Sequence, residues 1–89
     1  MSTTPTSAAF LLNAPFVWEQ ARHLARRVLR DAGELPDERV EHVYLTALSR
    51  RPRPEELELG RGFLAVGGEE ALVNYCHVIL GLNEFIYVH

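Results

Sequence analysis

Residues 71–82 carry apolar side chains on every side of a helix drawn through them. No face of such a helix can meet water without a loss of free energy, so we expect it to lie at the centre of the fold. The predicted helix spans residues 69–82, and Gly81 is expected to loosen its end. Residues 83–88 are expected to form a turn or an extended tail. The apolar positions are Ala71, Leu72, Val73, Tyr75, Cys76, Val78, Ile79, Leu80 and Leu82.

The first part of the chain shows a single apolar stripe with helical spacing, which predicts an amphipathic helix over residues 14–32. Asn13 suits its N-cap, and Pro15, which lacks an N–H donor, suits its first turn. Gly33 is expected to end the helix. A helix packed around a buried one should present one apolar face of this kind. The stripe consists of Val17, Ala21, Leu24, Val28 and Ala32.

Two further stripes predict helices over residues 36–49 and 54–66. Each begins at a proline followed by acidic residues, a common composition for a first helical turn. Gly60 lies on the expected inner side of the second of these helices. Because glycine there costs about 1 kcal/mol relative to alanine, we expect it to mark a close contact with another element. No segment alternates with the period of a strand. The sequence therefore predicts an all-α fold, a small bundle of four helices with a central apolar C-terminal helix.

Length and composition fit one globular domain. The chain has 89 residues, of which 47% are hydrophobic and 24% are charged. We place the domain at residues 8–89, after a flexible N-terminal tail at residues 1–7. The formal charge of −3 argues against non-specific binding of nucleic acid or of an anionic membrane by the whole molecule. The first residues lack the positive charge of a signal peptide, and the last helix is too interrupted to span a bilayer, so we predict no membrane association.

Three motifs, in order along the chain, resemble a known family. Residues 11–21 read LLNAPFVWEQA, residues 39–50 read RVEHVYLTALSR with PEEL at 54–57, and residues 83–88 read NEFIYV. They resemble the closing segment of a family of unknown function that consists of large planctomycete-type secreted proteins, often joined to cytochrome c modules. The resemblance covers residues 4–88.

This resemblance implies an exported or periplasmic setting, with the chain as the C-terminal part of a larger domain. It brings no established catalytic residue. Two positions depart from the family pattern. Ser49 stands where the family usually has glycine, which weakens the case for a left-handed C-cap, and Arg53 stands where a hydroxyl N-cap is usual.

Cys76 and His77 form the second half of a haem-attachment motif, but covalent attachment needs another cysteine at the position of Val73. A haem-associated or redox accessory domain therefore stays an alternative with little support. Cys76 is the single cysteine, which excludes an internal disulfide. Neither a cluster of metal ligands nor a phosphate-binding glycine loop is visible. We predict no catalytic, cofactor-binding or metal-binding residue, no cofactor and no enzymatic activity.

A basic stripe runs along the first predicted helix from Trp18 through Arg22 and Arg26 to Arg30, with Arg27 beside it. It is headed by an aromatic ring on which Arg22 can stack, and it is a candidate surface for nucleic acid or an acidic protein partner. The competing interpretation is that the stripe is a solvated or intramolecular face, because acids of the following helix can pair with its arginines. These acids are Glu34, Asp37, Glu38 and Glu41.

Arg50 and Glu84 each belong to a motif shared with the family. We predict that the Arg50 guanidinium binds the Glu84 carboxylate and ties the tail, with Phe85 and Tyr87, onto the bundle. The residues as a whole predict a non-catalytic helical module for packing or protein interaction. Its partner would be another protein, a surface of a larger parent protein, or a second copy in a homodimer. Nucleic acid is the less favoured partner because the net charge is negative.

Overall fold

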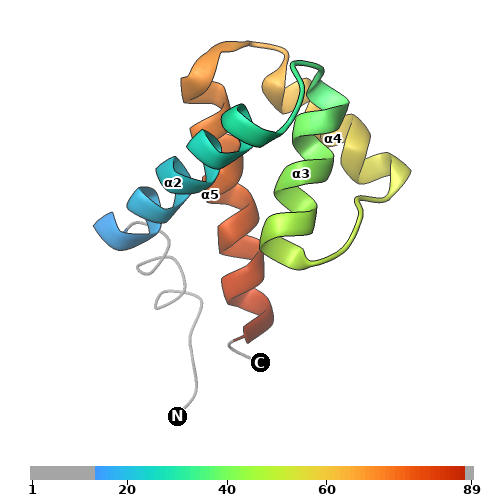
Figure 1. Cartoon of the computed structure of the whole chain (residues 1–89). Coiled ribbons are helices and arrows are strands. Elements are labelled where there is room, and N and C mark those ends of the chain that lie inside the picture. The colour runs from blue at the N-terminus through green and yellow to red at the C-terminus, as the bar shows by residue number, and fades with distance from the viewer. Residues whose placement is uncertain (1–13, 88–89) are drawn as a thin grey trace.

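The computed structural model describes the backbone of residues 14–87 and the side chains of residues 14–82, and these residues contain four α-helices. The helices are α2 (Pro15–Asp31), α3 (Pro36–Leu48), α4 (Pro54–Leu64) and α5 (Gly68–Tyr87) (Figure 1). The described residues contain no strand. The prediction of a small all-α bundle is confirmed. The predicted tail at residues 1–7 lies outside the described residues, as do the side chains of Glu84, Phe85 and Tyr87.

The starts of α3 and α4 follow from the same local sequence. Each helix has proline at its first position, and the residue before it is extended, with φ −72° and ψ 140° at Leu35 and φ −76° and ψ 162° at Arg53. In α3 the Leu35 N–H donates to Glu38 Oε1 at 3.3 Å, and in α4 the Arg53 N–H donates to Glu56 Oε1 at 2.8 Å. A glutamate three residues inside the helix thus satisfies the cap N–H that would otherwise lack a partner.

The start of α2 differs from the prediction. Ala14, and not Asn13, occupies the N-cap position, with φ −65° and ψ 141° and without a side-chain cap bond. Pro15 is the first helical residue, and a proline pushes the residue before it into the extended region, which fixes the boundary at Ala14. Asn13 itself lies outside the described residues.

Ser49 ends α3 in the left-handed region, with φ 57° and ψ 32°. The sequence argued against a left-handed C-cap here because serine replaces the usual glycine. That expectation is wrong, since Ser49 adopts the left-handed conformation. A residue with a Cβ pays about 1–2 kcal/mol for it. Gly67 and Gly68, with φ 83° and 85°, make the turn into α5 without that cost.

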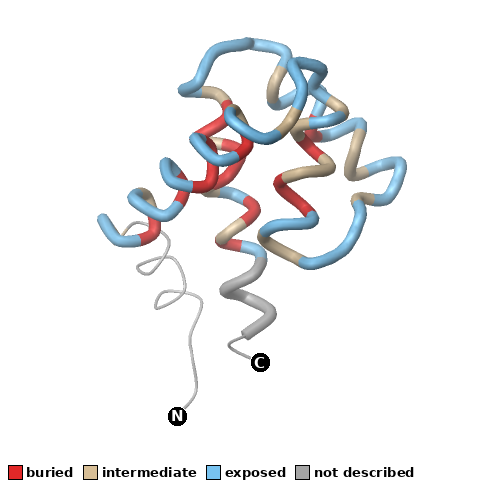
Figure 2. The backbone as a smooth tube through the Cα atoms, in the orientation of Figure 1, coloured by how far each residue is buried: buried red, intermediate tan, exposed pale blue. Residues whose placement is uncertain are grey.

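The core lies where α5 meets the other helices. α5 packs against α2, α3 and α4, with its largest contact to α2, whereas α2 and α4 do not touch each other. The buried residues face one another along these contacts, and the outer sides of α2 and α4 stay exposed (Figure 2). The predicted central position of the apolar C-terminal helix agrees with this packing. The core consists of Ala21, Leu24, Ala25, Val28, Val40, Val43, Tyr44, Leu72, Val73, Tyr75, Cys76 and Ile79.

Two details of the α5 prediction are wrong. The helix does not end at Leu82 but continues to Tyr87, so residues 83–87 are helical and do not form a turn or extended tail. Gly81 is buried inside this helix. Glycine costs a helix about 1 kcal/mol relative to alanine, but its N–H and C=O groups still form the helical hydrogen bonds, so the helix can continue through it. Not every face of α5 is covered either, because Val78 and Leu82 are 43% and 49% exposed.

Gly60 confirms the expected close contact. A Cβ atom at this position would lie 2.5 Å from Val40 Cγ2 and 2.8 Å from the Tyr75 hydroxyl. α4 therefore approaches α3 and α5 to a distance that only glycine allows without movement of its neighbours. None of the helices in the described part of the chain is long and apolar enough to cross a membrane.

Candidate interaction surfaces

The outer face of α2 carries the predicted arginine stripe, and its members differ in their partners. Arg30 binds Asp31, with Nε 3.0 Å from Oδ1, and this hydrogen bond holds the pKa of Asp31 below its ordinary value. Arg27 Nε lies 4.0 Å from the other oxygen of Asp31. Arg22 and Arg26 are exposed, and neither forms an ion pair with a described residue. The stripe thus keeps part of its positive charge available to solvent.

Trp18 takes a different position from the one predicted. Its ring stacks on the imidazole of His77 from α5, with ring centroids 3.7 Å apart and planes 8° from parallel. The predicted stacking on Arg22 is therefore replaced by a contact between α2 and α5. Trp18 is half-buried, and this contact makes it part of the helix packing rather than a free head of the stripe.

The acids proposed to neutralise the stripe bind elsewhere. Asp37 binds Arg61 of α4, with Oδ2 2.7 Å from Nη2, and this hydrogen bond lowers the pKa of Asp37. Glu38 accepts the Leu35 N–H, and Glu41 lies 4.0 Å from Arg51. No described ion pair joins Glu34 to the stripe either. These four acids therefore form no described ion pair with the stripe, and Asp31 on the same helix supplies the only described carboxylate partner of the α2 arginines.

Arg50 forms the tightest described ion pair at the connection between α3 and α4. Its Nη1 and Nη2 atoms bind Glu56 Oε1 and Oε2 at 2.8 and 2.9 Å, and its guanidinium lies 5.2 Å from the centre of the Tyr44 ring. The hydrogen bonds from Arg50, followed by that from the Arg53 N–H, lower the pKa of Glu56 to about 2. The described partner of Arg50 is therefore Glu56. The predicted pairing with Glu84 lies outside the described side chains.

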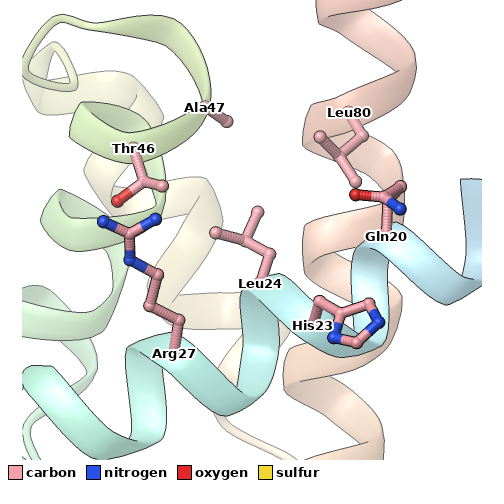
Figure 3. Close-up of a pocket in the computed structure, with 7 residues that line it drawn as sticks. All are labelled: Gln20, His23, Leu24, Arg27, Thr46, Ala47 and Leu80. Atoms are coloured by element: carbon pink, nitrogen blue, oxygen red, sulfur yellow. The ribbon is translucent and has the colours of Figure 1, made fainter.

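A shallow groove opens between α2, α3 and α5, with a volume of about 240 Å³. In Figure 3, Leu24 points into its middle, and Arg27 extends from α2 toward Thr46 on α3. Of the predicted partner-binding residues, only Arg27 lines this groove. Sequence reasoning missed the site because its residues come from three helices. They are Gln20, His23, Leu24, Arg27, Thr46, Ala47 and Leu80.

A comparison with known families places the chain. The family described as protein of unknown function (DUF1553), PSD1, matches residues 1–64. The chain belongs to this family. The match covers α2, α3 and α4, and α5 lies beyond it. No curated protein and no solved structure matches the chain. Membership of a family of unknown function is thus confirmed for most of the chain.

In this DUF1553 chain, Cys76 is part of the core. It is fully buried, and burial raises the pKa of its thiol to about 12, so the thiol stays neutral at physiological pH. Burial likewise raises the pKa of Tyr75 well above its usual range. No group of three or more histidine, cysteine, aspartate or glutamate side chains within the described residues is placed to hold a metal ion. The described part of the chain therefore offers no recognisable nucleophile or metal centre.

Apolar side chains also gather on the outer side of α4 and on one flank of α5. Leu59 and Phe63 lie one turn apart on α4, and Val66 lies two residues after its end; they are 74%, 41% and 87% exposed. The ring of Phe63 lies 5.4 Å from that of Tyr75 on α5. Val78 and Leu82 follow Tyr75 by three and seven residues, so helical spacing places them on the same side of α5 as Tyr75. We call these exposed residues the α4–α5 apolar face; its members are Leu59, Phe63, Val66, Val78 and Leu82.

Proposed function

We propose that the chain is a non-catalytic helical module that packs against another protein through the α4–α5 apolar face. The observation that carries this proposal is the exposure of five large apolar side chains, two on α4, one just after its end and two on α5. Single exposed apolar residues are common, but a connected group of them is typical of a protein interaction site. The buried thiol of Cys76 agrees with a role that involves no chemistry.

The partner that fits the family resemblance is a neighbouring surface of a larger, exported protein. When the chain is produced alone, a second copy can cover the same apolar face, so we expect a homodimer. A symmetric dimer would place the α4–α5 apolar face of each copy against the same face of the other. Burial of this apolar area would then stabilise both the contact and the fold.

The test is light scattering behind size exclusion over a range of concentrations, with a helical circular-dichroism melt of the same sample. The wild-type chain should give the mass of a dimer, and Leu59→Glu should give a monomer. Leu45→Glu is the matched control, since Leu45 is also exposed but lies on α3, outside the face. A monomeric wild type at every concentration, or equal effects of the two substitutions, would contradict the proposal.

A second candidate function rests on the α2 arginines. Arg22 and Arg26 have no described carboxylate partner, which supports a binding surface for an acidic protein or a nucleic acid. Binding of poly-glutamate or of a short DNA duplex should then weaken as salt is added. Arg26→Glu should abolish it, whereas Arg51→Glu, at an exposed site outside α2, should weaken it only slightly. Binding that ignores salt and Arg26 would remove this candidate.

A haem-associated or redox accessory role has no comparable support, because Cys76 is buried and His77 packs on Trp18. When haem is titrated with the protein, the Soret band should therefore stay the same as that of free haem. A new Soret band that is lost in Cys76→Ser would restore this alternative.

A further inference from the structure

We propose that the groove between α2, α3 and α5 binds a small carboxylate with a short apolar body. The proposal is independent of the α4–α5 apolar face, since the two surfaces share no residue. It rests on the chemistry of the groove lining, on the partners of Arg27 and on the size of the groove.

The groove has an apolar floor and a polar rim. Leu24, Ala47 and Leu80 supply the floor, one residue from each of the three helices. The rim offers hydrogen-bond donors from the remaining lining residues, and no carboxylate is among the described lining residues. A ligand that matches this surface has an apolar part and an anionic head. The rim residues are Gln20, His23, Arg27 and Thr46.

Arg27 is the residue suited to hold the anionic head. Its nearest described acid is Asp31, whose Oδ2 lies 4.0 Å from Arg27 Nε. Asp31 is already bound by Arg30, with donor–acceptor distances of 3.0 and 3.4 Å. The guanidinium of Arg27 therefore keeps its donors available, and it reaches across the groove toward Thr46 (Figure 3). A planar guanidinium binds a carboxylate through two parallel hydrogen bonds, which favours a carboxylate over other polar heads.

The volume limits the size of the ligand. About 240 Å³ is below the roughly 300–1,000 Å³ of most drug-sized sites. Hexanoate, with a carboxylate and a short alkyl chain, is a probe of this size. Hexanamide has the same shape without the charge, and it serves as the matched neutral probe.

The experiment is a titration of the full chain with hexanoate, followed by ¹⁵N–¹H correlation spectra. We expect saturable shifts at residues 20–27, at Thr46 and Ala47, and at Leu80, with a dissociation constant of about 1 mM. Hexanamide should bind at least about tenfold more weakly, because it lacks the charge that Arg27 recognises.

Two adjacent arginines provide the control. Arg27→Gln should weaken hexanoate binding about tenfold or more, whereas Arg26→Gln, which changes the charge equally but lies outside the groove, should leave it nearly unchanged. Ala47→Leu should abolish binding by filling the floor, independently of charge. Three outcomes would each overturn the proposal: no saturable shift with hexanoate, equal binding of hexanamide, or equal losses in Arg26→Gln and Arg27→Gln. Retained binding in a folded Ala47→Leu would overturn it as well.

Discussion

The helix pair α3–α4 and the outer face of α2 are both rich in arginine, but the arginines have different partners in the two regions. In this pair of helices, Arg50 and Arg61 each bind one carboxylate through two nitrogen atoms: Arg50 at the connection between them, and Arg61 at the opposite end, where α4 meets the start of α3. On α2, Arg22 and Arg26 have no described ion pair. In the first region the arginines are neutralised by carboxylates of the same chain, and in the second Arg22 and Arg26 are exposed to solvent.

The difference comes from where acids fall relative to the helix starts. α3 and α4 each begin with proline followed by two acids. The second acid of each pair accepts the cap N–H, and one acid of each pair, Asp37 or Glu56, binds an arginine from another segment. The first turn of α2 contains no acid. The number of arginines in a region therefore does not show whether they form ion pairs. The position of the nearest carboxylate does.

The largest expected effect is at the close contact of Gly60, where α4 packs against α3 and α5. Gly60→Ala places a Cβ against Val40 and the Tyr75 hydroxyl, and this overpacking should lower the free energy of unfolding by about 1–3 kcal/mol. Gly62→Ala is the control on the same helix, since its Cβ would meet nothing within 4 Å. It should be neutral or stabilise by up to about 1 kcal/mol through helix propensity. Urea unfolding of both variants measures the difference, and equal effects would refute the close contact.

A substitution at Ser49 should stabilise the fold, in contrast to Gly60→Ala. Glycine adopts the left-handed conformation of this residue without a Cβ penalty, so Ser49→Gly should raise the free energy of unfolding by about 0.5–1 kcal/mol. The same urea experiment measures it. A destabilised variant would mean that the left-handed C-cap at the end of α3 is absent in solution.

A comparison of two alanine substitutions tests the two uses of arginine directly. Arg50→Ala removes the bonds to Glu56 and the contact with the Tyr44 ring, and it should lower the melting temperature by a few degrees. Arg22→Ala removes a side chain without a described ion pair and should leave the melting temperature nearly unchanged. Equal shifts in circular-dichroism melts would erase the distinction between the two regions.

The ion pair between Arg50 and Glu56 should also make the stability of the fold depend on pH. The folded state holds the pKa of Glu56 at about 2, below the ordinary 4.5, so the unfolded chain binds more protons between these values. The stabilisation is present above about pH 4.5 and is lost as the pH falls toward 2. Glu56→Gln should therefore melt below the wild type at neutral pH, with a gap that narrows on acidification. Glu55→Gln, in the same helical turn, should keep the wild-type dependence.

Local sequence predicted much of the fold. The prolines before α3 and α4 fixed their starts, the apolar stripes indicated their inner faces, and Gly60 marked a close contact. The wrong details depend on tertiary packing: α5 continues through Gly81, and it leaves Val78 and Leu82 exposed because the other helices cover only part of its surface. The Glu56 partner of Arg50 had a local signal, a glutamate three residues inside the helix. The Trp18–His77 stack and the groove had none, because they join residues distant in sequence.

The measurement that tests the proposed interaction surface most directly is a dilution series of ¹⁵N–¹H correlation spectra of the wild-type chain. If the α4–α5 apolar face is the contact surface, concentration-dependent shifts should gather at Leu59, Phe63, Val66, Val78 and Leu82, and α2 signals such as Arg22 and Arg26 should stay constant. Shifts that gather on α2, or spectra that do not change with concentration, would contradict a role for the α4–α5 apolar face.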